Sequence, residues 1–218
     1  MTMNFKQLLL ASAVMMTLAV PAFAQDATTT TAPIDKPVST AGQPLSAATE
    51  TQRDVNQQDR IENGLKSGQL STGEAAKLEK GEAKIDNLEA KDMKNGPMTA
   101  QEKAQIQKDQ NKESKAIYAD KHNAVKGNPD SASSERMQKD VQRNVNQEKR
   151  IHNGVENGSL TNKEAGSLEK GQARTDRKEY RAGKDGNVSA REQRHIQNRQ
   201  NRQSGKIWNK KHNRRNRK

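Results

Sequence analysis

The chain repeats itself at a constant offset of 90 residues. Residues 55–57 (Val-Asn-Gln) return at 145–147, and residues 78–81 (Leu-Glu-Lys-Gly) return at 168–171. About 31 of the 69 positions in 55–123 are identical to the residue 90 positions later, with no gap. A duplication this regular predicts two copies of one supersecondary unit, so any fold must be built from the same unit twice.

A short motif that occurs twice in each repeat predicts that the unit is three helices. It reads Gly, then an apolar residue before Ser or Thr, then Glu three residues after that hydroxyl. Glycine suits the left-handed end of a helix, and the hydroxyl and glutamate form a capping box at the start of the next one. The predicted helices are 51–66, 72–94, 100–123, 141–156, 162–184 and 190–213.

The composition predicts thin cores for these helices. From residue 25 onward Leu, Ile and Val make up only about 11% of positions, well below the roughly 20% under which disorder is suspected. Ile106 and Ile117 share a helix face with Gln110 and Ser114, and all four recur in the second repeat, which indicates side-chain hydrogen bonds or a wet seam there. We therefore expect an all-α protein of two tandem three-helix units with thin cores, partly disordered.

The start of the chain resembles a secretory signal. Lys6 precedes an apolar run, and residues 21–24 (Pro-Ala-Phe-Ala) form a small-x-small cleavage site. We expect cleavage after Ala24 and a periplasmic or secreted protein, and the absence of cysteine agrees with an oxidising compartment. The expected organisation is signal 1–24, flexible leader 25–50, first repeat 51–126, linker 127–140, second repeat 141–213 and basic tail 214–218.

The two repeats differ in charge. Residues 51–126 sum to about +1 and residues 136–218 to about +14, and like charges at such density favour an anionic partner. We expect lipopolysaccharide, anionic lipid or nucleic acid to bind the last helix and tail, and a solvated surface that only keeps the protein soluble is the competing interpretation. The candidate polyanion-binding residues are Arg191, Arg194, Arg199, Arg202, Lys206, Trp208, Lys210, Lys211, Arg214, Arg215, Arg217 and Lys218.

Signals for catalysis or metal binding are weak. The segment 185–192 has the Gly and Glu of the second half of an EF-hand loop, but Arg181 and Gly183 stand where the first oxygen ligands belong. His122, His152, His195 and His212 lack metal-ligand spacing, and His122 and His212 fit helix ends. Glu79 and Glu169 recur together with lysine neighbours, which favours ion pairs on helix surfaces. We expect no enzyme, no cofactor and no metal site.

The pattern Arg-Ile-x-Asn-Gly, followed by Gly-x-Leu-Ser/Thr-x-x-Glu-Ala-x-x-Leu-Glu, resembles a group of uncharacterised small secreted proteins of proteobacteria built from this unit. The resemblance covers residues 51–123 and 141–213 and implies an exported all-helical protein without a known activity. The composition is also similar to that of hydrophilin-type desiccation proteins. The expected function is polyanion binding without catalysis; the alternatives are a stress-protective or chaperone-like protein without a specific ligand, and a weak EF-hand-like calcium binder.

Overall fold

The computed structural model describes residues 46–213, and it confirms the all-α prediction: within them the regular elements are six α-helices and a short 3-10 turn. The elements are α1 (Ala47–Lys66), α2 (Thr72–Asp92), η1 (Met93–Asn95), α3 (Ala100–His122), α4 (Ala132–Glu156), α5 (Asn162–Gly183) and α6 (Ala190–Lys211). The expected signal, nearly all of the expected leader, and the tail residues 214–218 lie outside the described residues. None of the described helices combines the length and the apolar character that a membrane span requires.

The four predicted capping boxes are all present. Ser71, Thr99, Thr161 and Ser189 each accept a hydrogen bond from the backbone of the glutamate three residues on, whose carboxylate accepts one from the cap in return. The glycines of the motif adopt positive φ angles, between 70° and 118°. These turns need glycine because a Cβ is disfavoured in that conformation.

Two helices begin earlier than predicted. α1 begins at Ala47 rather than residue 51, and α4 at Ala132 rather than 141, so α4 covers much of the segment expected to be a linker. Ser46 and Ser131 cap these starts, and Ser131 Oγ accepts from the Ser134 amide at 3.1 Å. The extra helix also contributes buried side chains, among them Met137. The start of α4 was not predicted because apolar residues are sparse in this polar segment.

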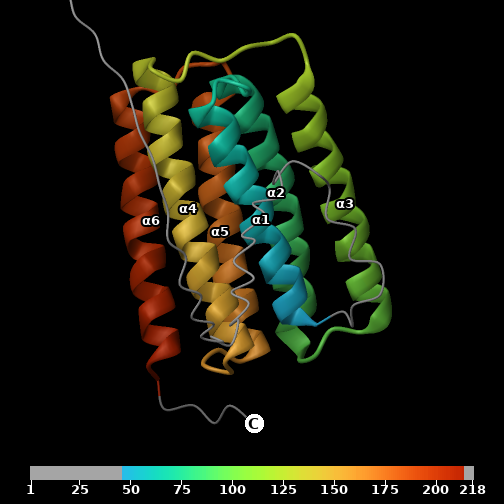
Figure 1. The fold of residues 1–218 in the computed structure, drawn as a ribbon. Coiled ribbons are helices and arrows are strands. Elements are labelled where there is room, and N and C mark those ends of the chain that lie inside the picture. The colour runs from blue at the N-terminus through green and yellow to red at the C-terminus, as the bar shows by residue number, and fades with distance from the viewer. Residues whose placement is uncertain (1–45, 214–218) are drawn as a thin grey trace, which may run out of the picture. The chain divides into compact units, whose positions relative to one another are not determined.

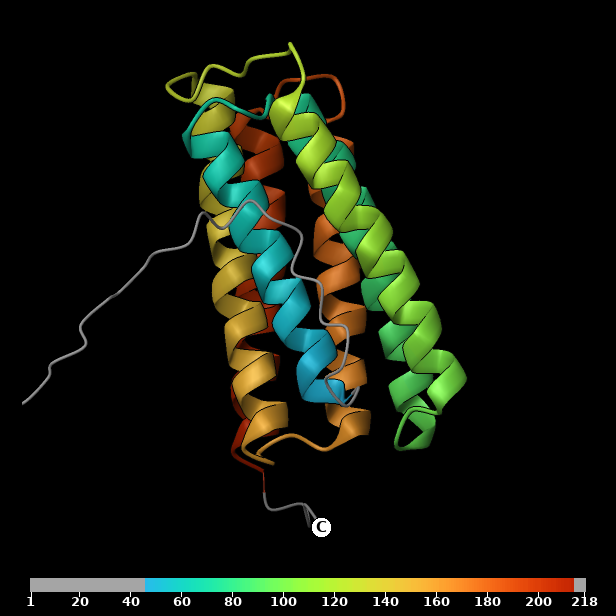
Figure 2. The same cartoon turned by 45° about the vertical axis from the view of Figure 1, so that its right-hand side comes forward.

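The two repeats pack against each other helix by helix. α2 packs on α5 and α1 packs on α4, while α3 lies against α1 and α2, and α6 against α4 and α5 (Figures 1 and 2). The four central helices therefore form one bundle, and the third helix of each repeat flanks it.

Both central pairs run antiparallel. On α2 and α5, a Cβ added at Gly183 would lie 2.9 Å from Ala76 Cβ, and one at Gly166 would lie 2.9 Å from Met93 Cβ. On α1 and α4, Lys149 Nζ lies 3.2 Å from Asp59 Oδ1, and these two residues occupy the same position of their repeats. The repeats are thus related by an approximate two-fold axis that passes between equivalent positions.

The buried apolar side chains form separate clusters. The largest gathers the C-terminal parts of α1, α3 and α5 and the starts of α2, α4 and α6, around Ile61, Leu65 and Met137. Two smaller clusters around Met93 and Ile151 occupy the opposite helix ends. Between these clusters the middle of the bundle contains many buried polar side chains beside a few apolar ones such as Ile85 and Val145.

Candidate functional site

A band of buried carboxylates fills the middle of the bundle. On α2 the acids stand at 79, 82, 86 and 89, a 3-4-3 spacing that places them on one helix face. The same positions of α5 hold Glu169, Gln172, Asp176 and Glu179, and α4 adds Glu148. We call the following eight residues the carboxylate core: Glu79, Glu82, Asp86, Glu89, Glu148, Glu169, Asp176 and Glu179.

These side chains are buried without cationic partners. Each of the eight is at most 3% exposed, and within residues 46–213 no lysine, arginine or histidine forms an ion pair with any of them. The prediction that Glu79 and Glu169 form ion pairs on the helix surface is therefore wrong: both are fully buried, whereas Lys80 and Lys170 are exposed. Successive residues of a helix point in different directions. In both repeats the glutamate therefore points into the bundle and the lysine that follows it points to solvent.

Burial raises the pKa of every member of the carboxylate core, and repulsion by neighbouring acids raises it further in all of them except Glu79. Burial raises the pKa of Glu79 to about 7, and burial with the charges of Asp54 and Glu79 raises the pKa of Glu148 to about 8. The pKa of Glu169 lies well above its usual value because of burial first and the charge of Glu148 second. Near neutral pH the core must therefore take up protons or another positive charge.

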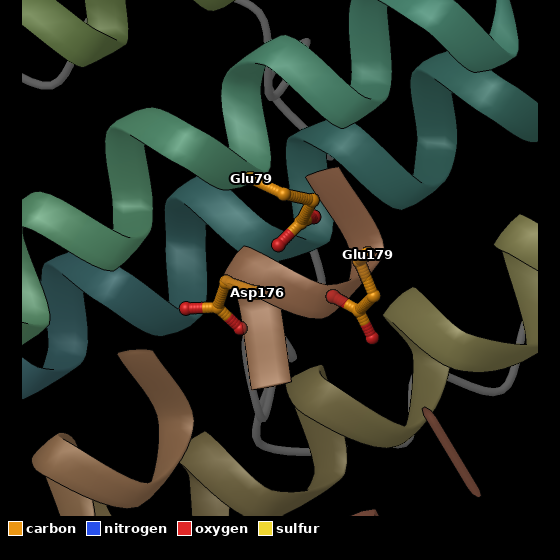
Figure 3. A group of neighbouring side chains, drawn as sticks. All are labelled: Glu79, Asp176 and Glu179. Atoms are coloured by element: carbon orange, nitrogen blue, oxygen red, sulfur yellow. The ribbon is translucent and has the colours of Figure 1, made fainter. Parts of the chain in front are cut away.

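Glu79 of α2 and Asp176 and Glu179 of α5 form one compact group, named site A here. One oxygen from each lies within 4.8 Å of the others, and Figure 3 shows Glu79 on α2 near Asp176 and Glu179 on α5. Opposite oxygens around a Ca²⁺ ion, each bonded at 2.3–2.6 Å, are separated by about this distance. The three oxygens are therefore close enough together to contact one cation of this size.

Asp86 of α2, Glu148 of α4 and Glu169 of α5 form a second group with the same spacing, named site B here. Through the repeat, Glu169 is equivalent to Glu79 and Asp86 to Asp176. Two acids of each site are therefore related by the approximate two-fold axis, whereas the third, Glu179 in site A and Glu148 in site B, differs between them.

Amide side chains hold the carboxylates in place. Asn144 Nδ2 donates to Glu179 Oε2 at 2.6 Å, and Gln200 Nε2 donates to Glu179 Oε1 at 3.2 Å. In the first repeat Gln110 Nε2 donates to Asp54 Oδ1 at 2.8 Å and to the backbone carbonyl of Glu50. The side-chain hydrogen bonds expected from the recurring Gln110 position are thus confirmed, and they belong to the frame of the core.

Several oxygens of the core have no hydrogen-bond donor. Both carboxylate oxygens of Glu82 and of Glu169 lack one, as does one oxygen each of Glu79, Asp86 and Glu148. The amide of Gln58, on α1, donates to Glu79 at 3.1 Å, and its own buried oxygen Oε1 also has no donor. Leaving buried acceptors unpaired is costly, and cations bound at sites A and B would give partners to oxygens of the six acids that form them.

Sequence reasoning missed these residues because it treated acids as solvent-facing. The signal was present in the 3-4-3 spacing of acids on residues 79–89, repeated with one change on residues 169–179. The ordinary expectation is that glutamates at such spacing face water. The burial arises only when the second repeat packs onto the first.

The residues predicted to bind polyanions lie elsewhere, on α6. Arg191, Arg194, Arg202 and Lys206 are exposed and Arg199 is partly buried, and in the described part of the chain none of these five forms an ion pair with a carboxylate. We call these five residues the basic face of α6.

The remaining predicted residues of this set are more varied. Trp208 is exposed and stacks on His212 with ring centroids 4.6 Å apart, and Lys210 is partly buried. Lys211 Nζ donates to the Arg150 carbonyl at 3.0 Å. Arg214, Arg215, Arg217 and Lys218 lie outside the described residues.

The EF-hand-like segment is a helix start in the structure. Glu192 Oε2 accepts hydrogen bonds from the amide and hydroxyl of Ser189, and Asp185 Oδ1 accepts from the Asn187 amide. His122 and His212 each donate from Nδ1 to the carbonyl four residues earlier, at 2.7 Å. No histidine belongs to site A or site B.

The comparisons with known proteins leave the site to be interpreted from its own chemistry. No family model, no curated protein and no solved structure matches this chain.

Proposed function

We propose that this protein binds hard multivalent cations inside the bundle, and that it does so as an exported binding protein rather than an enzyme. The observation that carries the proposal is the carboxylate core itself: eight buried acids, without cationic partners, between helices of two repeats. Carboxylate and amide oxygens without nitrogen or sulfur ligands suit Ca²⁺, Mn²⁺ and trivalent ions rather than Zn²⁺ or Cu²⁺.

Two observations support a ligand rather than a purely structural role. Buried carboxylates are normally paired, because desolvation of an unpaired charge costs several kcal/mol. Here the amide of Gln58 donates to Glu79, whose other carboxylate oxygen stays unpaired, and both oxygens of Glu169 have no donor. An arrangement with orientation fixed and acceptors left open is that of a binding site.

The direct test is calorimetric titration of the full chain with Ca²⁺, Mn²⁺ and Tb³⁺, with Zn²⁺ as the soft-ion control, together with thermal melts. We expect saturable binding and a rise in melting temperature with each ion. Binding should be strongest for Tb³⁺, because its higher charge interacts most strongly with the three carboxylates of each site. Absence of binding at millimolar Ca²⁺ and Mn²⁺ and at submillimolar Tb³⁺ would refute the proposal.

A second candidate function, polyanion binding, rests on the basic face of α6. The equivalent positions of α3 hold Gln101, Ala104, Asp109, Lys112 and Ala116. The inward residues, in contrast, are kept: Ile106, Gln110 and Ile117 match Ile196, Gln200 and Ile207, and all are buried. At these positions the basic charge of α6 has been added on the outer face, as expected for a surface that contacts phosphate groups.

The variant Arg191→Gln, Arg194→Ala, Lys206→Ala tests this second function. It gives α6 the residues that α3 already carries at the same positions, so the fold should be retained. We expect elution from heparin, and from immobilised lipopolysaccharide, at clearly lower salt than the unmodified protein. Unchanged elution, with unchanged helix content by circular dichroism, would exclude α6 as the contact surface.

A further inference from the structure

We infer that the core is a two-cation centre in which sites A and B each hold one ion and site B fills first. The inference rests on the proposed cation binding and adds the number of ions, their ligands and their order. It follows from comparing the two sites residue by residue through the repeat.

The central acids are the same in the two sites. Glu79 and Asp176 of site A correspond to Glu169 and Asp86 of site B, so each site combines one glutamate and one aspartate from opposite repeats. Neither site is complete within a single repeat, because the ligands of each come from α2 and α5 together.

Around these acids there are two positions at which one repeat has an acid where the other has an amide. Position 58 is Gln and its equivalent 148 is Glu, whereas position 82 is Glu and its equivalent 172 is Gln. Gln58 contacts Glu79 of site A, and Glu148 belongs to site B beside Gln172. The charges of Glu79 and Asp176 of site A act on Glu82, after those of Glu113 and Asp54. Each site therefore has one acid and one amide near its shared glutamate and aspartate, at exchanged positions of the repeat.

Site B has more carboxylate oxygens without a hydrogen-bond donor than site A. In site A both oxygens of Glu179 already accept hydrogen bonds, from Asn144 and Gln200. In site B both oxygens of Glu169 and one oxygen each of Asp86 and Glu148 have no donor. More free oxygens favour the first cation at site B.

The test is calorimetric titration of the full chain with Tb³⁺ and with Ca²⁺, comparing Glu148→Gln with Glu179→Gln. For the unmodified protein we expect two ions per chain in two steps. Glu148→Gln should weaken the tighter step at least tenfold and leave the other, and Glu179→Gln should do the reverse. Each substitution replaces one carboxylate by an amide of the same size, so each controls for the other.

The variant Gln58→Glu supplies an independent arm, should an acid-to-amide variant fail to fold. It places in the first repeat the residue that the second repeat already has, and we expect it to tighten the weaker step at least tenfold. One ion per chain, or loss of both steps in either single variant, would overturn the two-site inference while leaving cation binding intact. No binding of either probe would instead refute the proposed function.

Discussion

At the scale of single residues, the stability of the empty protein and its affinity for cations place opposite requirements on the same buried carboxylates. Glu169 is fully buried and neither of its carboxylate oxygens has a donor. An ionised carboxylate in such a place destabilises the empty protein, and it is also a strong ligand for a cation. Stability without ions and affinity for ions should therefore change in opposite directions when it is replaced.

The substitution Glu169→Gln tests this opposition. We expect the melting temperature in chelator near pH 8 to rise by a few degrees, because one buried charge is removed, while the rise on adding Ca²⁺ or Tb³⁺ becomes much smaller. The matched control is Glu135→Gln, on the exposed surface beside Lys139, which should leave both quantities nearly unchanged. A Glu169→Gln protein with lower stability in chelator would show that this carboxylate stabilises the empty fold.

At the scale of helices, the close approach of α2 and α5 depends on small residues. A Cβ at Gly166 would lie 2.9 Å from Met93 Cβ and 3.2 Å from the Ala90 carbonyl oxygen, so the two helices would have to separate. Gly81 and Gly171 serve a different purpose, since their missing Cβ leaves room for the ends of Glu113 and Gln203 from the flanking helices. Glycine in these helices therefore spaces the elements that carry the core.

Gly166→Ala and Gly205→Ala form a matched pair for this argument. Gly205 lies within α6 with nothing within 4 Å of an added Cβ, so alanine there should stabilise the protein by about 0.5–1 kcal/mol. Gly166→Ala should instead destabilise it by roughly 1–3 kcal/mol through overpacking and weaken cation binding. Urea unfolding of both variants gives the comparison, and equal stabilisation by both would mean that the α2–α5 spacing is soft.

The elements were largely predictable from the sequence, and the core was not. The capping motif determined four helix starts within a residue, because each start is a local event of hydrogen bonding between near neighbours. The starts at Ala47 and Ala132, whose serine caps lack the glutamate, were missed. The inward orientation of Glu79 and Glu169 depends on the packing of one repeat against the other, and the 3-4-3 spacing of acids alone does not distinguish a buried helix face from an exposed one.

At the scale of the whole molecule, the empty protein should lose stability as the pH rises. Burial raises the pKa of Glu79 to about 7 and of Glu148 to about 8, above the value of roughly 4.3 for glutamate in an unfolded chain. Between these values the folded state binds more protons than the unfolded state, so the free energy of unfolding falls as pH rises from about 4.5 to about 8.

Thermal melts in chelator between pH 5 and pH 8 measure this effect, and we expect the melting temperature to fall by several degrees across that range. With saturating Ca²⁺ or Tb³⁺ the dependence should weaken or reverse, because cations then compete with protons for the same oxygens. The capping glutamates Glu74 and Glu164 act oppositely, since their pKa values are lowered and their contribution is lost only in more acidic solution. A melting temperature in chelator that rises steadily to pH 8 would contradict the prediction.

The approximate two-fold axis also bears on how such a chain could arise. A single repeat that paired with an identical copy would build the same four central helices, and residues on the axis would then face themselves: position 59 would meet position 59. In a homodimer that contact could only be between like residues. With both copies in one polypeptide, the position holds Asp59 against Lys149, an ion pair at 3.2 Å that identical subunits could not make. Fusion of the copies thus allowed two sites with different ligands, and an asymmetric charge on the outer helices, within a frame that remains symmetric.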